Sequence, residues 1–271
     1  MYEIALVNMP FSTTHLPSIA LTQLKSVLHG QFGERVSVKI HYLNHDFARH
    51  MGLDRYAMIA NSLQSTVTGL GDWLFRSAAF PDAADNTEVY LARHMWQFPR
   101  EYNDEIGELV NGQRGQIASF LDELIDRYAL DRCSLVGFTS MFTQSVASFA
   151  MARKLKQRNP ALVTVMGGAN CEMSMGKVIA KNVEAIDYVF SGPALKSFPQ
   201  LVEHLVEGRG DECHKITGVF SKKKLALELV VGGNEIGQEL DIDVEVPLDY
   251  DDYFASYEDK CPSGTKAGVA H

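Results

Sequence analysis

The sequence lacks the apolar run that a membrane-spanning helix needs. No stretch approaches the roughly 20 consecutive apolar residues that cross a bilayer, and the Met-Tyr-Glu-Ile start carries no basic leader. Cysteine is also scarce, since Cys133, Cys171, Cys213 and Cys261 lie far apart without a Cys-x-x-Cys pair. That spacing favours isolated thiols in a reducing compartment over a disulfide framework or a zinc site. We therefore expect a cytoplasmic protein.

Positive charge is in short supply as well. The chain has 25 lysines and arginines against 34 aspartates and glutamates, a formal net charge of -9. This balance argues against a surface for nucleic acid or for an anionic membrane. With 271 residues, 46% of them hydrophobic, the chain is long enough for one large domain with a full core, or for one domain with an appendage.

The common phosphate-binding loops are missing too. A dinucleotide site of the Gly-x-Gly-x-x-Gly type would follow the first strand, but that position reads Asn8-Met9-Pro10-Phe11-Ser12-Thr13 and has no glycine. No Gly-Lys-Ser/Thr follows a strand, which excludes a P-loop. A flavodoxin-type FMN site requires a first loop rich in hydroxyl groups. Ser12, Thr13 and Thr14 provide hydroxyl groups in that loop, but their spacing matches the flavodoxin pattern only approximately.

Strands and helices nevertheless alternate along much of the chain. Ile4–Val7 is an apolar run typical of a buried parallel strand, and Val36–Tyr42 alternates as an edge strand does. Between them, apolar residues from Ile19 to Leu28 recur at helical spacing. Three further strands, with helices after each of them, are expected at Ser134–Phe138, Val163–Met166 and Ile186–Phe190. This alternation predicts an α/β fold of flavodoxin-like (Rossmann-type) topology, a doubly wound parallel five-stranded sheet in the order 2-1-3-4-5.

A helical insertion is expected between strands two and three, over about residues 52–130. No convincing strand appears there, and we predict helices over 53–68, 70–79, 86–97, 102–110 and 113–129. We expect its aromatic residues to pack the insertion against the sheet, and secondarily to line a pocket; they are Trp73, Phe75, Phe80, Trp96 and Phe98.

The predicted organisation has three parts. Residues 1–213 form the Rossmann-type domain, and residues 214–232 form a β-hairpin with Lys222-Lys223-Lys224 at its tip. The acidic and polar residues 233–271 form a linker and a loose tail.

Two strand ends carry the residues from which a binding site can be built. Thr139-Ser140-Met141 follows the third strand, and Gly167-Gly168 ends the fourth. A hydroxyl and two glycines at neighbouring strand ends let a long, flat group slide between strands while the backbone approaches it closely. Taken alone, however, Gly167-Gly168 reads as a tight strand-to-helix turn.

These elements resemble the Ser-x-Leu and Gly-Gly elements of cobalamin-binding domains, in which the nucleotide tail of base-off cobalamin threads into the sheet. Further strings narrow the resemblance to the N-terminal half of the cobalamin-dependent radical SAM enzymes that mature ribosomally made peptides. The similarity covers about residues 3–254. The strings are Val7-Asn8-Met9-Pro10-Phe11, Pro17-Ser18-Ile19-Ala20-Leu21, Leu43-Asn44-His45-Asp46-Phe47-Ala48, Gly71-Asp72-Trp73-Leu74-Phe75, Gly137-Phe138-Thr139-Ser140-Met141-Phe142, Gly167-Gly168-Ala169-Asn170-Cys171-Glu172, and Pro247 with Asp249-Tyr250-Asp251-Asp252-Tyr253-Phe254.

The resemblance implies cobalamin as the cofactor, bound without a protein histidine. His15 is a weak axial candidate, because the Asp-x-His-x-x-Gly pattern of histidine-ligated cobalamin domains is missing around it, and a solvent-facing loop histidine is the alternative. Asp46-x-x-x-His50 has the wrong spacing. The residues implied to contact the cofactor are Met9, Pro10, Phe11, His15, Thr139, Ser140, Met141, Gly167, Gly168, Ala169, Asn170, Ser191 and Gly192.

The sequence departs from that family in two ways. No Cys-x-x-x-Cys-x-x-Cys occurs, so the thiolates that would hold a [4Fe–4S] cluster are missing. Gly192 is followed by Pro193-Ala194-Leu195 where the family has acidic residues.

We therefore expect a cobalamin-binding module that is not catalytic alone. It would act as half of a split enzyme with a separate radical SAM protein or a precursor peptide, as a cobalamin- or light-responsive module, or as one domain of a larger maturase. The alternatives are a small flavin-type enzyme that uses the same crevice, and a degenerate domain that binds a protein or leader peptide.

Overall fold

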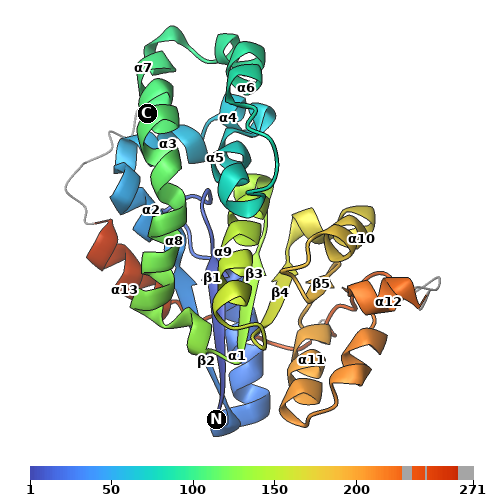
Figure 1. The fold of residues 1–271 in the computed structure, drawn as a ribbon. Coiled ribbons are helices and arrows are strands. Elements are labelled where there is room, and N and C mark those ends of the chain that lie inside the picture. Colours follow the sequence, from blue (N-terminus) through green and yellow to red (C-terminus); the bar gives the residue numbers. More distant parts are fainter. Residues whose placement is uncertain (228–233, 242, 262–271) are drawn as a thin grey trace.

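A mostly parallel sheet of six strands organises the molecule. The structure is a computed structural model that describes residues 1–227, 234–241 and 243–261. The sheet order is β2-β1-β3-β4-β5-β6, and the first five strands of that order are parallel neighbours (Figure 1). The bounds are β1 Tyr2–Asn8, β2 Val36–Tyr42, β3 Leu135–Thr139, β4 Val163–Gly167, β5 Tyr188–Phe190 and β6 Val219–Phe220. The predicted α/β class is confirmed, but the count of five strands is wrong, because β6 adds an antiparallel strand beside β5.

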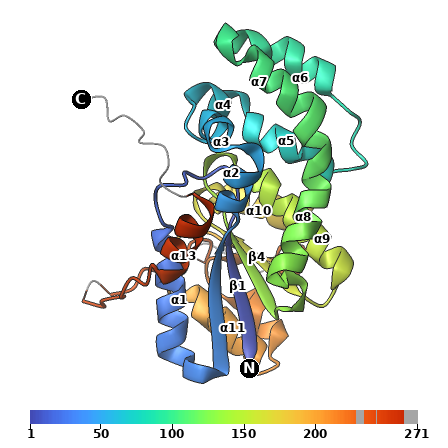
Figure 2. The ribbon, with the colours of Figure 1, turned by 90° about the vertical axis from the view of Figure 1, so that its left-hand side faces the viewer.

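Helices cover both faces of the sheet, because successive strand residues point to opposite sides. Ile4 and Leu6 of β1 lie in the core under α1 (Ile19–Phe32) and α11 (Ser197–Val206). Ala5 and Val7 lie in the larger core on the other face. Helices α8 (Arg114–Tyr128), α9 (Ser145–Arg158) and α10 (Met173–Asn182) contribute to that second core. Figure 2 shows α1 on one side of the strands and α8 and α9 on the other.

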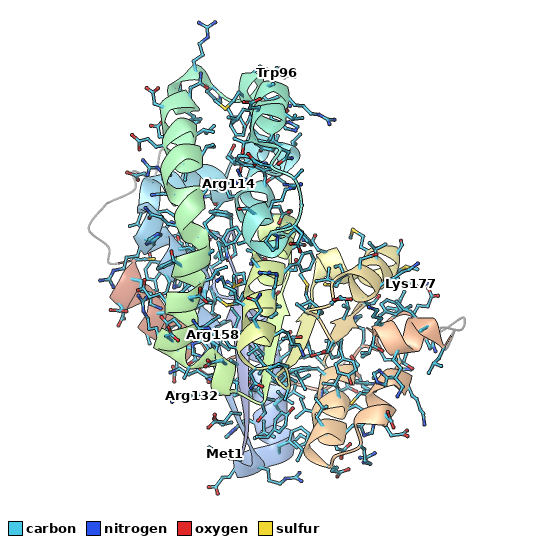
Figure 3. All side chains as sticks on the ribbon, in the orientation of Figure 1. Met1, Trp96, Arg114, Arg132, Arg158 and Lys177 are labelled. Atoms are coloured by element: carbon cyan, nitrogen blue, oxygen red, sulfur yellow. The ribbon has the colours of Figure 1, made fainter. Side chains whose placement is uncertain are left out.

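The helical insertion between β2 and β3 is present. The expected helix over 53–68 is two helices, because the Ser62 side chain accepts a hydrogen bond from the backbone N–H of Ser65 and starts a second helix. Of the five aromatic residues, Trp73, Phe75 and Phe98 are buried in the core, whereas Trp96 is 78% exposed and Phe80 is partly exposed. Figure 3 shows Trp96 at the far end of the insertion. The helices are α2 Leu43–Met51, α3 Leu53–Ala60, α4 Leu63–Thr68, α5 Leu70–Ala79, α6 Thr87–His94 and α7 Asn103–Glu108, with the short turns Met95–Gln97 and Arg100–Tyr102 and a π-helix over Leu109–Gln113.

The region predicted as a hairpin is built differently. Lys222–Ala226 forms helix α12, because the Ser221 hydroxyl accepts from the N–H of Lys224 and begins a helical turn. Lys224 is fully buried, and its Nζ donates to the carbonyl oxygens of Ile216 and Val219 at 2.7 and 2.8 Å. The lysine run is therefore not a hairpin tip, and residues 228–231 of the expected second strand lie outside the described residues.

The region predicted as a loose tail contains an ordered helix, α13 (Asp251–Lys260), docked against β2 and α2. The Asp252 carboxylate accepts from the backbone N–H of Ile40 at 3.0 Å and from Lys25 Nζ at 2.8 Å. Tyr253 is buried, and Lys260 donates to the buried carboxylate of Asp46 at 2.9 Å. The polar composition that indicated a tail instead supplies the contacts of this helix; residues 262–271 lie outside the described residues.

Short 3-10 turns complete the description, and they are Gly33–Arg35, Leu130–Arg132, Phe142–Gln144, Ala169–Cys171 and Gly210–Lys215. No helix in the described ranges is long and apolar enough to cross a membrane.

Candidate functional site

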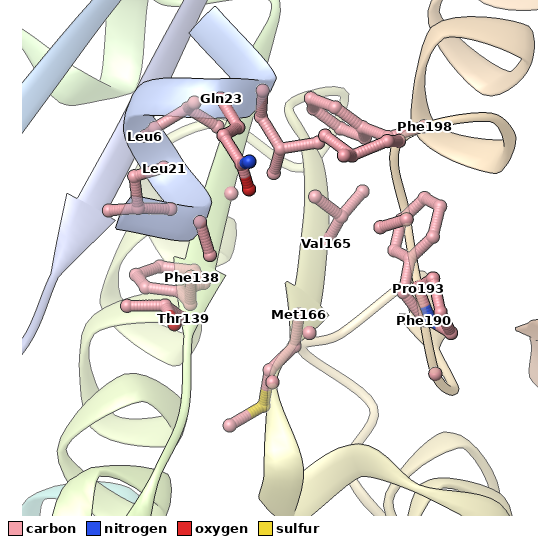
Figure 4. Close-up of a pocket in the computed structure, with 18 of the residues that line it drawn as sticks. Leu6, Leu21, Gln23, Phe138, Thr139, Val165, Met166, Phe190, Pro193 and Phe198 are labelled. Atoms are coloured by element: carbon pink, nitrogen blue, oxygen red, sulfur yellow. The ribbon is translucent and has the colours of Figure 1, made fainter. Parts of the chain in front are cut away.

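An apolar cavity of about 310 Å³ lies between the sheet and helix α1, at the carboxyl ends of the strands. This is the place where open α/β sheets bind ligands. The floor comes from residues of β1, β3, β4 and β5, one wall from α1, and the opposite wall from α11 and the loop before it (Figure 4). Its apolar lining includes Leu6, Leu21, Leu24, Phe138, Val165, Met166, Phe190, Pro193, Ala194, Leu195 and Phe198.

Glycines on two neighbouring strands leave this space open. Gly137 is paired with Leu6 on one side and Val165 on the other, and Gly167 is paired with Thr139. A Cβ on Gly137 would lie 2.9 Å from a Leu6 methyl carbon. A Cβ on Gly167 would meet only Phe190 Cβ, at an ordinary 3.5 Å, and Gly167 itself lines the cavity. Gly167 is therefore the position at which a larger side chain would enter the cavity without colliding with the backbone.

The loops around the cavity are cross-linked by buried hydrogen bonds. Gln144 joins the loops after β1 and β3, since its Nε2 donates to Asn8 Oδ1 at 2.9 Å and to the Met9 carbonyl at 2.6 Å. Its Oε1 accepts from the N–H of Met141 at 3.0 Å. The rim of the site is thus pre-organised on this side.

Ser140 and Asn170 join the next pair of loops. Asn170 Nδ2 donates to the Ser140 hydroxyl at 3.1 Å, to the Ser145 hydroxyl at 3.0 Å and to the Phe142 carbonyl at 2.8 Å. Ser140 is fully buried. The structure thus brings these two predicted site residues together. Their polar groups, however, form hydrogen bonds between the loops and do not point to a ligand.

Gly168 has the same supporting role. Its φ is +106°, and a Cβ there would lie 2.4 Å from the Ser140 carbonyl oxygen. The close approach that this glycine permits is to the neighbouring backbone. Ala169, directly after it, is exposed.

The loop after β5 is held by its own contacts. The Ser191 hydroxyl accepts from the N–H of Met173 at 2.8 Å, and its carbonyl accepts from Gly237 N at 2.7 Å. Gly192 lines the cavity with φ +77°, and a Cβ there would meet Ile236 at 2.6 Å. Residues 234–241 therefore lie directly against the cavity wall, and Glu239 is part of the lining.

The predicted residues of the first loop lie elsewhere. Met9, Pro10 and Phe11 are buried, and Phe11 packs on Tyr56 and Phe75, with ring centroids 5.2 and 6.1 Å apart. None of these three lines the cavity. His15 is exposed, and its Nδ1 lies 3.3 Å from the Tyr257 hydroxyl of α13. It faces α13 instead of the cavity.

Large apolar side chains stand exposed on the loops beside the cavity. Met141 and Phe142, directly after β3, are 51% and 67% exposed, and Leu16 on the loop after β1 and Met173 at the start of α10 are also exposed. Phe142 and Met173 have φ of +52° and +47°, a conformation that costs free energy for residues with a Cβ. We call Leu16, Met141, Phe142 and Met173 the apolar rim.

Two buried titratable side chains, Cys171 and Asp72, have raised pKa values. Burial raises the pKa of the Cys171 thiol to about 12, so it stays protonated at neutral pH. Burial also raises the pKa of Asp72 to about 6, although its Oδ1 accepts from Val146 N at 2.9 Å. In the described ranges no three His, Cys, Asp or Glu side chains are grouped to hold a metal ion.

Several site residues were not expected from the sequence. Leu21, Gln23 and Leu24 belong to α1, where their helical spacing indicates only a core-facing stripe, and Phe198 of α11 gives the same signal. Gln144 was not expected because the acceptors of its Nε2 group, Asn8 and Met9, lie about 135 residues away in the sequence. Comparison with protein-family models, curated proteins and solved structures gives no match.

Proposed function

We propose that this chain is a cobalamin-binding module in which the cavity receives the nucleotide tail of the cofactor. The observation that carries the proposal is the side-chain-free floor at Gly137 and Gly167, beneath an apolar cavity at the carboxyl edge of the sheet. A planar heteroaromatic base needs a flat, apolar slot of this kind. The flavodoxin-like strand order, with β6 added at one edge, agrees with it.

The apolar rim supports the proposal independently. A corrin ring is a broad macrocycle, and it requires an exposed, largely apolar surface next to the slot that takes its tail. Leu16, Met141, Phe142 and Met173 offer such a surface on the loops after β1 and β3 and at the start of α10. Phe142 and Met173 have left-handed backbone conformations, which cost conformational free energy. Strained backbone of this kind is frequent at functional sites.

The charges of the cavity do not suit a phosphate, so the phosphate of a cobalamin tail, like that of FMN, would lie outside the cavity, with only the base or the flavin ring inside it. Among the lining residues that the structure describes, Glu239 is the one charged side chain, and no lysine or arginine is present to neutralise a phosphate. Thr14 in the first loop is buried, with its carbonyl accepting from Tyr253. FMN therefore stays the second candidate.

The module would act with a partner. Cobalamin, when bound, supplies methyl-transfer or redox chemistry at cobalt, while the residues of this chain hold its tail, order the rim and exclude water from the slot. The residues that would hold it are Thr139, Gly167 and Gly192 in the cavity and Met141 on the rim; Ser140, Gly168 and Asn170 would shape the loops beneath. We propose a separate radical SAM protein or a precursor peptide as the partner.

Retention of hydroxocobalamin tests the proposal. The purified chain is incubated with an excess of hydroxocobalamin, desalted, and its visible spectrum recorded; we expect retained corrin absorbance. Gly167→Val should abolish retention while the protein stays folded, because a side chain at this position would project into the cavity without colliding with the backbone. Gly30→Val is the matched control, since a Cβ at Gly30 meets nothing within 4 Å. A folded wild-type protein that retains no corrin would overturn the proposal, and retention of FMN instead would favour the flavin alternative.

A further inference from the structure

Three polar side chains without a described protein partner line the cavity, Gln23 of α1 and Thr139 of β3 at partly buried positions and Glu239 at an exposed one. Within the described ranges none of the three side chains makes a hydrogen bond or an ion pair. Figure 4 shows the Gln23 side chain reaching from α1 toward the space beside Val165, with Thr139 at the end of β3. A few unpaired polar groups around an apolar pocket are the usual means by which a pocket selects its ligand.

The chemistry of the three groups defines what they can recognise. A carboxylate only accepts hydrogen bonds, whereas the Gln23 amide and the Thr139 hydroxyl each donate and accept. The other described residues of the lining are apolar side chains or glycines, and none of them is cationic. The complementary ligand is therefore flat, uncharged or cationic, and carries at least one N–H donor beside ring acceptors.

We propose that the cavity selects an aminopurine base such as adenine. The base would come either as the tail of a corrinoid, which rests on the proposed function, or as a free adenine nucleoside. Its exocyclic amine would donate to Glu239 or to the Gln23 carbonyl, and its ring nitrogens would accept from the Gln23 amide or from Thr139. A glycosylated dimethylbenzimidazole has no N–H donor, so it would leave the carboxylate without a partner.

The test compares matched ligands. Dissociation constants are measured for hydroxocobalamin, for the same corrinoid with adenine as the tail base, for adenosine, and for dimethylbenzimidazole riboside. We expect the adenine member of each pair to bind about 10-fold more tightly, as one additional satisfied hydrogen bond provides. Gln23→Met and Glu239→Met should remove this preference and leave the dimethylbenzimidazole ligands little changed. Gln116→Met, at an exposed position of α8, is the control.

Each outcome decides between the two proposals. Equal affinity for both corrinoids, or a preference that survives both variants, overturns the selection of an aminopurine and leaves the cobalamin proposal in place. Binding of adenosine that depends on Gln23, without binding of either corrinoid, supports the selection and overturns the cobalamin proposal. If none of the four ligands binds the folded protein, both proposals fail.

Discussion

A Cβ atom on Gly168 would lie 2.4 Å from the carbonyl oxygen of Ser140, while one on the adjacent Gly167 would touch nothing closer than 3.5 Å. Glycine is thus required at these two neighbouring positions for different structural reasons. Gly168 lets the loops after β3 and β4 meet backbone to backbone, and Gly167 keeps the floor of the cavity clear.

Alanine should separate these two roles. We expect Gly168→Ala to lower the free energy of unfolding by about 2–4 kcal/mol, because φ is +106° and the backbone contact is too short for a methyl group. Gly167→Ala should change it by less than about 1 kcal/mol. Urea denaturation measures both, and equal losses would show that the two glycines share one role.

Gln144 should be important for stability although its side chain carries no charge. Gln144→Met removes two hydrogen bonds donated by Nε2 and one accepted by Oε1, and leaves buried backbone groups unpaired. We expect a loss of about 2–3 kcal/mol and faster amide exchange at Met141. Gln157→Met, on the exposed side of α9, is the matched control. A loss no larger than that of the control would contradict the cross-linking role.

Acid should destabilise the fold through its buried histidines. Burial, with Lys39 nearby, lowers the pKa of His41 to about 4 from its ordinary 6.5, and burial lowers the pKa of His45 to about 4 as well. Between pH 6.5 and 4 the unfolded chain binds the protons first, so the free energy of unfolding should fall with falling pH over this range. His41→Phe should flatten that fall by up to about 3 kcal/mol. The free energy of unfolding is measured by denaturation at several pH values from 7 to 4. If it falls with pH as steeply in His41→Phe as in the wild type, the prediction is wrong.

Asp72 should act in the opposite direction. Its folded-state pKa of about 6 lies above the ordinary 3.8, so the charged form costs free energy above pH 6 and the cost is relieved between pH 6 and 3.8. Asp72→Asn keeps an acceptor for the Val146 N–H and should raise the free energy of unfolding at pH 7 by about 1–2 kcal/mol. The gain should disappear near pH 4, and a gain independent of pH would point to another cause.

The sequence predicted what depends on local pattern. The apolar runs at Ile4–Val7 and Val163–Met166 identified strands, and the strand order from β2 to β5 followed from their alternation with helices. The two-residue β6 is too short to produce a pattern, and it forms because Val219 and Phe220 pair with β5. Helix α13 was missed because its stability comes from contacts with Lys25 and Asp46, more than 200 residues earlier in the chain.

The site was predicted only in part for the same reason. Thr139, Gly167, Gly168 and Gly192 line the cavity as strand-end residues do. Met9 and Phe11 follow a strand as well, but the helical insertion lies over them and turns them into core residues. Nothing in the local sequence shows which loop an insertion covers.

Helix α13 has a consequence for the behaviour of the protein at high concentration. A terminal strand such as β2 exposes amide and carbonyl groups that a second chain can use as a template. The Asp252 carboxylate accepts a hydrogen bond from the Ile40 N–H, and the rest of α13 packs against β2. We therefore expect that α13 protects the edge strand β2 from pairing with a second chain. A protein truncated before residue 251 should aggregate under conditions in which it is still folded.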